Sequence, residues 1–418
     1  MRRPWHEFRD LAEPRNVTLV SATHGVNEFF SIAIPPIIPF LVADLEITFA
    51  QAGLLLTVFF LMYSIFQLPA GLLADRVGKK RLLAGGLVVM VAGIALAATA
   101  QNYPMLVLAQ VVAGIGGATY HPTGMALISD FETTTTEGKA MGVFGFGGMI
   151  GVATAPLLIG GLAEAVSWRV GLAAAASLGL AFTAGFILLF AEPEDRQARA
   201  IEDGGDRQAQ PSTQLDRVRN LLRVPVTLSI VLLLLLTVLV SLQTRAIMTF
   251  TTSFVSASGG QSVGMANVVF FAMLAAGSIS SLAAGSLADR FSRWRLGLVV
   301  SAVTGVLLVA AYPLAVGGVR LPEWALLALL LVLFSALGLA MYACVPVKNA
   351  LISQEAEREY SASLFGLTQT ASAIGSASGP AIFGFLATEA SMDVAFPFIA
   401  VTSGLMVLAF VLLSRSLE

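Results

Sequence analysis

The chain has 418 residues, of which 56% are hydrophobic and only 12% are charged. A soluble domain carries about 25% charged residues, so this composition is typical of a protein whose surface faces lipid. The net charge of −2 gives no reason to expect nucleic-acid binding, and the single cysteine, Cys344, excludes an intramolecular disulfide.

Long apolar stretches recur along the whole chain, and a membrane-spanning helix needs about 20 mostly apolar residues. Twelve stretches are long enough: 17–42, 50–73, 82–100, 104–129, 140–164, 170–191, 226–255, 262–287, 296–316, 323–350, 361–387 and 393–414. We therefore predict an all-α integral membrane protein with twelve transmembrane helices.

One long polar segment interrupts these stretches. Residues 192–224 are rich in charge and contain Gly-Gly and Pro, which is typical of a flexible linker. The predicted organisation is a six-helix half at 1–191, a cytoplasmic linker at 192–224, and a second six-helix half at 225–418.

The distribution of basic residues predicts the orientation. All but four of the 24 lysines and arginines fall on one side of the twelve-span topology; Arg169 and Arg320 fall on the other, and Arg245 and Lys348 lie within spans. Because cytoplasmic loops carry the excess of Lys and Arg, both termini are predicted to be cytoplasmic, in the inner membrane of the cell.

The two halves repeat three motifs in the same order. The matching pairs are AGLLADRVGKKR (70–81) with AGSLADRFSRWR (284–295), HPTGMALISD (121–130) with VPVKNALISQ (345–354), and GVATAPLLIGG (151–161) with GSASGPAIFGF (375–385). This pattern indicates duplication and predicts pseudo-symmetric halves that rock about a site near the bilayer midplane.

These motifs also resemble those of a known family. GLLADRVGKKR resembles the loop signature of the major facilitator superfamily, and GVATAPLLIGG resembles the Gly/Pro motif of its drug/proton antiporters. HGVNEFF (24–30), ITFAQAG (47–53) and YHPTG (120–124) are similar to motifs of its fosmidomycin-resistance branch. Gln110 stands where many antiporters have arginine, so no proton-coupling role is carried over to that position. The resemblance implies a secondary transporter that works by alternating access.

A polar face interrupts the first apolar stretch. His24, Asn27 and Glu28 are spaced i, i+3 and i+4, so they share one side of a helix. An acid in hydrocarbon costs about 3 kcal/mol, so this face must look into the bundle or a wet cavity. We predict that Glu28, with His24, couples protons to transport. The alternative is that Glu28 pairs with His24 or with a lysine or arginine and only holds helices together.

Three further cationic candidates, with Asn27, form the predicted substrate cavity. His121 precedes Pro122 and is either a core histidine or a ligand contact. Arg245 either faces the cavity or extends to the outer interface, and Lys348 either serves the site or extends to the inner interface. Cations in a cavity would favour an anionic substrate, such as the phosphonate drug exported by the resembling branch.

Two other sets of residues have predicted mechanical roles. The first set corresponds to residues that, by the resemblance to the major facilitator superfamily, are implied to form a conformational latch on the cytoplasmic side: Gly71, Asp75, Arg76, Lys79, Asp289 and Arg290. The alternative for its basic members is a topology signal alone. The second, predicted to allow close helix packing, contains Gly151, Pro156, Gly160, Gly375, Pro380 and Gly384.

The sequence carries no enzyme motif, no nucleotide-binding loop and no metal-ligand spacing, so no catalytic residue, metal or cofactor is expected. We predict a monomeric transporter in the lipid bilayer whose partners are protons and a small molecule, and whose mechanism is proton-coupled efflux of a small drug-like molecule. The alternatives are uptake of a small anion or sugar-like solute by symport or uniport and, in another class, a membrane sensor that does not transport.

Overall fold

The computed structural model describes residues 11–133, 135–191, 224–257, 261–315, 321–356 and 361–417. Its residues group into two compact units, Met1–Ala33 with Leu61–Ala209, and Ile34–Phe60 with Gln210–Glu418. We call them unit 1 and unit 2 and describe each by itself. Residues 192–223 of the predicted linker lie outside the described residues, and the predicted domain boundaries stay a prediction.

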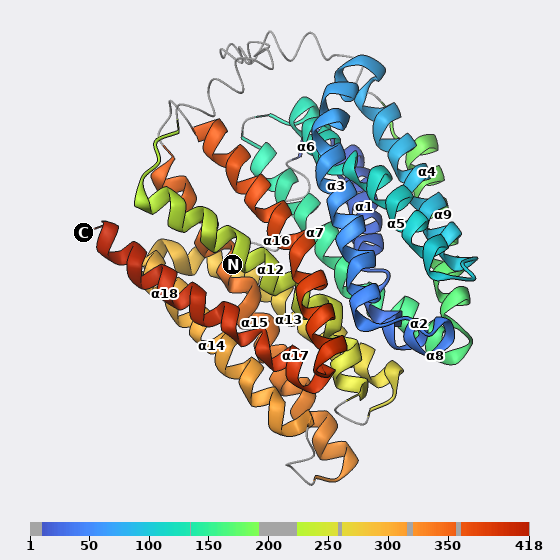
Figure 1. Cartoon of the computed structure of the whole chain (residues 1–418). Coiled ribbons are helices and arrows are strands. Elements are labelled where there is room, and N and C mark those ends of the chain that lie inside the picture. Colours follow the sequence, from blue (N-terminus) through green and yellow to red (C-terminus); the bar gives the residue numbers. More distant parts are fainter. Residues whose placement is uncertain are drawn as a thin grey trace. The chain divides into compact units, whose positions relative to one another are not determined.

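Among the described residues of unit 1, all regular secondary structure is helical (Figure 1). Its elements are α1 (Pro14–Ser31), the second half of α3 (Phe49–Val77), α4 (Lys79–Ala98), α5 (Tyr103–Ala118), α6 (Tyr120–Phe131), α7 (Glu137–Ala155), the π-helical turn η3 (Pro156–Gly160), α8 (Gly161–Ala165) and α9 (Trp168–Leu189).

The regular secondary structure in the described residues of unit 2 is also helical. Its elements are the 3-10 turn η2 (Pro35–Ile37), α2 (Ile38–Leu45), the first half of α3, α12 (Leu228–Ala257), α13 (Val263–Arg290), α14 (Arg293–Ala315), α15 (Glu323–Glu355), α16 (Ser361–Glu389), α17 (Met392–Phe398) and α18 (Ala400–Leu417). Apolar side chains of α12, α15 and α18, among them Leu233, Leu351 and Phe410, are buried together in its core.

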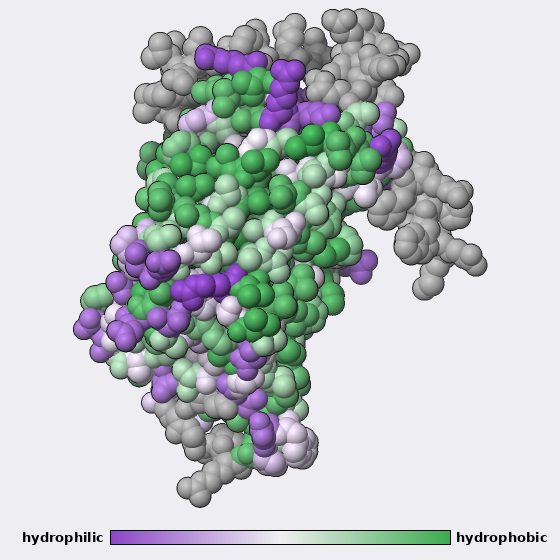
Figure 2. Space-filling view, turned by 90° about the vertical axis from the view of Figure 1, so that its right-hand side faces the viewer, coloured by the Kyte–Doolittle hydropathy of each residue, from purple (hydrophilic) through white to green (hydrophobic). Residues whose placement is uncertain are grey.

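Many large apolar side chains point outward. Leu188 is 81% exposed and Val306 is 68% exposed, and hydrophobic residues cover much of the face drawn in Figure 2. Such a surface is unfavourable in water and suits a lipid environment. Among the described residues, ten helices are long and apolar enough to cross a membrane, or eleven if one bent pair is counted as a single span. The predicted span 361–387 forms α16, which is not one of these, so the count of twelve stays a prediction.

The bent pair corrects the prediction of one continuous helix over 17–42. The chain leaves α1 at Ser31 and resumes at Pro35, with a bend of 40° between the two helical segments. Pro35 and Pro36 are consecutive, so two adjacent backbone N–H donors are missing and two rings clash with the preceding turn, and the α-helix breaks at this point.

Glycines bring helix backbones together within each unit. In unit 1, a Cβ atom added to Gly151 or Gly147 of α7 would collide with the Gly25 or Ser21 carbonyl oxygen of α1. In unit 2, a Cβ on Gly375 of α16 would collide with the Val238 carbonyl oxygen of α12. Close backbone approach replaces the hydrophobic driving force that is absent between helices in lipid.

The remaining predicted packing residues occupy related places. Pro156 and Gly160 bound the π-helical turn η3, where the helix register shifts. Pro380 lies inside α16, and its carbonyl oxygen would meet a Cβ added to Gly53. A Cβ on Gly384 would lie 2.6 Å from the Phe49 carbonyl oxygen.

One contact recurs at matching repeat positions in the two units. In unit 1, Lys79 Nζ donates to both carboxylate oxygens of Asp130, at 2.8 and 2.7 Å. In unit 2, Arg293 Nη1 donates to Gln354 Oε1 at 3.2 Å. Lys79 and Arg293 hold the same position of the first repeated motif, and Asp130 and Gln354 close the second. The sequence repeat therefore coincides with a repeated contact.

Candidate functional site

A buried polar cluster lies within unit 1, where α1, α3, α6 and α7 contribute side chains. Glu28 is at its centre, with a side chain only 17% exposed. His121 Nε2 of α6 lies 3.2 Å from Glu28 Oε1, and His24 Nε2 of α1 lies 3.8 Å from the same oxygen. Asn27 Nδ2 donates to this oxygen at 3.2 Å. The cluster thus surrounds the acid with polar groups.

The helical repeat of α1 explains why its three polar residues lie together. His24, Asn27 and Glu28 share one face, and that face is buried: His24 is 5% exposed and Asn27 is 0% exposed. The position of His121 depends on the break between α5 and α6. Pro122 cannot donate to the Ala118 carbonyl, α5 ends at Ala118, and the new helix places His121 beside Glu28.

The orientation of His24 is fixed on two sides. Its Nδ1 lies 2.7 Å from the Phe144 carbonyl oxygen of α7, and its ring stacks on Phe144 with 3.8 Å between centroids and 4° between planes. A carbonyl oxygen only accepts hydrogen bonds, so Nδ1 must carry a proton. In the neutral ring, Nε2 then has a free lone pair that faces Glu28.

This geometry disfavours the state in which neither His24 Nε2 nor Glu28 carries a proton. A neutral His24 and an ionised Glu28 would present two acceptors to each other across 3.8 Å. His24 Nε2 has no hydrogen-bond partner in the described part of the chain. A proton on either group removes the conflict, so the geometry favours states in which His24 Nε2 or Glu28 carries a proton.

Several members of the site were not predicted from the sequence. Tyr63 of α3 accepts from Asn27 Nδ2 at 3.2 Å, and Tyr120 donates to the Val20 carbonyl at 2.5 Å. Phe144 holds the His24 ring. Tyr120 is part of the quoted YHPTG motif, which was a usable signal. For Tyr63 and Phe144, the sequence carried no signal beyond their place in apolar stretches.

Gly148 of α7 gives the His24 ring its room. A Cβ atom at this position would lie 2.5 Å from His24 Cε1 and 3.2 Å from Glu28 Cγ. We expect Gly148→Ala to displace both side chains, to destabilise the protein by about 1–3 kcal/mol, and to reduce transport. Thermal unfolding in detergent and flux in vesicles measure the two effects.

Gly145→Ala is the matched control on the same helix, because no atom lies within 4 Å of the added Cβ. Alanine favours a helix over glycine by about 1 kcal/mol, so the control should be as stable as the wild type or more so. Equal behaviour of the two variants would contradict the packing argument.

The remaining predicted cavity residues lie in unit 2. The Arg245 guanidinium stacks over the Phe60 ring, with Cζ 4.2 Å from the centroid. Within the described ranges, no carboxylate lies within ion-pair distance of Arg245. Lys348 on α15 is only 7% exposed, and its role at the site or at the inner interface stays a prediction. The structure therefore brings together His24, Asn27, Glu28 and His121 within unit 1, whereas Arg245 and Lys348 belong to unit 2.

The predicted latch residues are described only in part. Lys79 is paired with Asp130, as above, and a Cβ on Gly71 would lie 4.0 Å from Pro122 Cβ. Arg76 and Arg290 are exposed. The side chains of Asp75 and Asp289 lie outside the described residues, so the latch stays a prediction.

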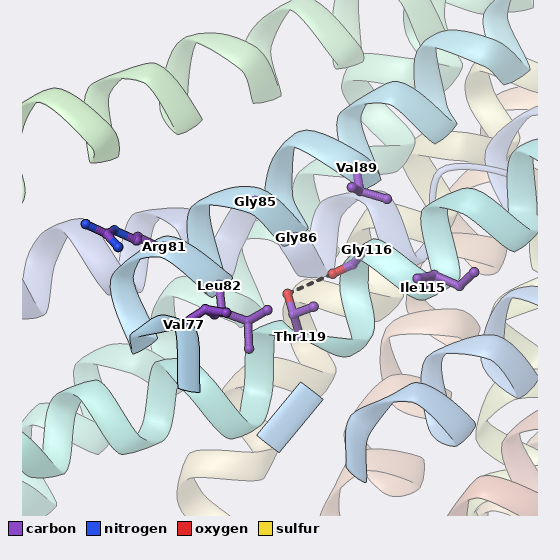
Figure 3. A pocket seen from close by; sticks show the side chains of 9 residues that line it. All are labelled: Val77, Arg81, Leu82, Gly85, Gly86, Val89, Ile115, Gly116 and Thr119. Carbon is purple, nitrogen blue, oxygen red and sulfur yellow. Dashed lines mark hydrogen bonds between the residues drawn. The ribbon is translucent and has the colours of Figure 1, made fainter. Parts of the chain in front are cut away.

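A groove of about 360 Å³ lies along α4 of unit 1 (Figure 3). Its lining residues are Val77, Arg81, Leu82, Gly85, Gly86, Val89, Ile115, Gly116 and Thr119. Arg81 is its one charged lining residue, and no member of the cluster lines it.

A bundle of long apolar helices around a buried acid and two imidazoles defines a multi-pass membrane protein with a polar site at its interior. Residues 20–380 match the Major Facilitator Superfamily, and the chain belongs to this family. As a member of this family it is a multi-pass membrane protein of the major facilitator type.

Curated relatives match parts of the chain. The probable L-galactonate transporter of Escherichia coli (strain K12) is 31% identical over 159 residues, which are 38% of this chain and 35% of that protein. The probable nitrate transporter NarT of Staphylococcus carnosus (strain TM300) is 29% identical over 136 residues, 32% and 34% of the two chains. A multidrug resistance protein B homolog of Mycobacterium tuberculosis (strain CDC 1551 / Oshkosh) is 32% identical over 128 residues, 31% and 24%. Each match thus spans about a third or less of the relative.

Solved structures match the whole fold. A bacterial homolog of the human lysosomal transporter Spinster, in its inward-facing and occupied conformation, has a TM-score of 0.77 at 16% identity and covers 99% of this chain and 98% of that one. A single-residue mutant of the nucleoside transporter NupG has a TM-score of 0.76 at 14% identity, covering 95% and 100%. At these identities the likeness concerns the fold alone.

Proposed function

We propose that this protein exports a small, drug-like molecule in exchange for protons, by alternating access, with Glu28 as the coupling acid and His24 as its partner. The proposed architecture has twelve spans in two pseudo-symmetric six-helix halves, which the contact repeated at Lys79–Asp130 and Arg293–Gln354 supports. The protein acts as a monomer with both termini in the cytoplasm.

The observation that carries this proposal is the position of Glu28 between His24 Nε2 and His121 Nε2. An ionisable group inside a membrane bundle marks an ion or substrate path by default. The His24 tautomer is fixed by the Phe144 carbonyl, so its free nitrogen can take a proton only from the side of Glu28. The His121 side chain is 36% exposed, and it connects the buried acid to a more accessible surface.

Export is favoured by sequence features of the cluster. The HGVNEFF and YHPTG motifs, which resemble the fosmidomycin-resistance branch, supply His24, Asn27, Glu28 and His121. A relative named as a multidrug resistance protein supports the same direction.

Uptake of a small anion is the second candidate. Two of the relatives are named as transporters of galactonate and nitrate, both of which are anions. Arg245, which has no carboxylate within ion-pair distance among the described residues, supplies a positive charge for such a substrate. The sensor alternative lacks support in a family of transporters.

The test uses purified protein in lipid vesicles with an imposed pH gradient and the phosphonate drug fosmidomycin as the probe. We expect the drug to move against its concentration gradient while protons move in the opposite direction. Empty vesicles are the control. Movement of drug and protons in the same direction would favour uptake by symport. Drug flux that is independent of the pH gradient would favour uniport.

A further inference from the structure

We propose that His24, Glu28 and His121 form a binding site for a divalent transition-metal ion of the Zn²⁺ class. The ligand-capable atoms of the three side chains lie within 4.8 Å of one another. The binding itself is independent of the proposed function, whereas its consequence for transport, a competition between metal and protons for the same atoms, rests on that function.

The spacing of the three side chains is close to what zinc requires. Ligand bonds of about 2.0–2.2 Å in tetrahedral geometry separate neighbouring ligand atoms by roughly 3.3–3.6 Å. His121 Nε2 and Glu28 Oε1 are 3.2 Å apart, and His24 Nε2 and the same oxygen are 3.8 Å apart. Shifts of a few tenths of an ångström bring these two pairs to the required spacing. The His24 and His121 ligand atoms lie within 4.8 Å of each other, so an ion draws them together by up to about 1.5 Å.

His24 is already arranged as a metal ligand. A coordinating histidine usually donates its second ring N–H to a carbonyl or carboxylate, which fixes the tautomer and the ring plane. His24 Nδ1 lies 2.7 Å from the Phe144 carbonyl oxygen, and Phe144 stacks on the ring. The opposite nitrogen, Nε2, has no hydrogen-bond partner in the described ranges, although the residue is only 5% exposed. A buried lone pair aimed at a carboxylate is the strongest pointer to a ligand here.

The carboxylate is held in place as well. Asn27 Nδ2 donates to Glu28 Oε1, and Asn27 also contacts Tyr63. Such outer contacts orient the first ligands and typically change metal affinity about 10–100-fold when they are lost. The site therefore has both the ligands and the supporting residues of a metal centre.

The donor set selects the class of metal. Two imidazoles and one carboxylate suit Zn²⁺, Co²⁺ and Ni²⁺, whereas Mg²⁺ and Ca²⁺ require about six or more oxygen ligands. Three protein ligands leave a fourth position for water or another small ligand. Binding requires the ligands to be deprotonated, so each ion bound releases the protons that the cluster holds.

Binding is measured on the full chain in detergent, after removal of any affinity tag, by equilibrium dialysis against Zn²⁺. We expect one ion per chain, with no displacement by excess Mg²⁺, and tetrahedral Co²⁺ absorption in the visible spectrum when Co²⁺ is used. His121→Ala and Glu28→Gln should each weaken Zn²⁺ binding by at least about tenfold. His6→Ala is the matched control, because His6 is the one histidine of the chain's three that is not a proposed ligand. This variant should bind Zn²⁺ as the wild type does.

Two outcomes overturn the proposal. One is unchanged Zn²⁺ binding by both His121→Ala and His24→Ala, which would place the ion elsewhere; the other is no binding by the wild type. His121→Gln is a milder variant if His121→Ala elutes as an aggregate. A protein that binds no Zn²⁺ but loses proton-driven flux in Glu28→Gln would contradict the metal site and leave the proposed function intact. A protein that binds Zn²⁺ but whose transport does not depend on the pH gradient would support the metal site and contradict the proposed function.

Discussion

Replacing Glu28 by glutamine is expected to abolish proton-driven transport while the protein still exchanges substrate across the membrane. Glutamine keeps the size of the side chain and an acceptor oxygen for Asn27 Nδ2, but it cannot gain or lose a proton. Flux driven by a pH gradient should fall by about tenfold or more, because the group that links the two gradients is gone. Exchange of labelled for unlabelled substrate at equal pH needs no net proton movement, so it should persist.

The measurement compares both fluxes in the same vesicle preparation. Glu164→Gln is the control, because Glu164 is an exposed acid on α8 that lies outside the cluster. Loss of both gradient-driven flux and exchange would indicate that Glu28 holds the helices together, as the alternative interpretation states. Unchanged gradient-driven flux would remove Glu28 from the mechanism.

The sequence was sufficient to predict the polar face of the first helix. The i, i+3, i+4 spacing of His24, Asn27 and Glu28 determines that they lie together, whatever surrounds the helix. His121, which precedes Pro122, was predicted to share a cavity with Asn27, and the structure places both beside Glu28. The sequence was not sufficient to predict the contacts of Tyr63 and Phe144, which come from two other helices and depend on helix rotation, which composition does not encode.

The same limit explains the other differences. The apolar run over 17–42 has the composition of one span, yet Pro35 and Pro36 divide it into two helical segments. Apolar side chains favour a membrane span, but they do not replace the backbone N–H donors that the two prolines lack. Sequence repeats predicted related halves but not the contacts that the repeated residues make. Lys79 meets Asp130 in unit 1, and the uncharged Gln354 takes the matching place in unit 2, so the contact position recurs although the ion pair does not.

Arg245→Ala is expected to weaken the binding of anionic substrates and to leave neutral ones almost unaffected. The guanidinium lies over the Phe60 ring, which holds its plane without neutralising its charge, and no carboxylate of the described residues is within ion-pair distance. Hydrogen bonds to a charged group contribute about 1.5–3 kcal/mol, which corresponds to roughly a 10–150-fold change in Kd. Binding of fosmidomycin and of an uncharged ester of it, measured by calorimetry in detergent, gives the two values.

The control is Arg169→Ala, because Arg169 stacks on Trp168 at 4.1 Å in the same manner but belongs to unit 1. Equal loss of anionic and neutral binding in Arg245→Ala would mean that the side chain supports the fold of α12 rather than substrate charge. Arg245→Lys separates the remaining possibilities. It keeps the positive charge but loses the planar, bidentate donor, so recovery of most of the anion affinity would assign the effect to charge. Failure of lysine to restore it would assign the effect to the fixed geometry that Phe60 gives the guanidinium.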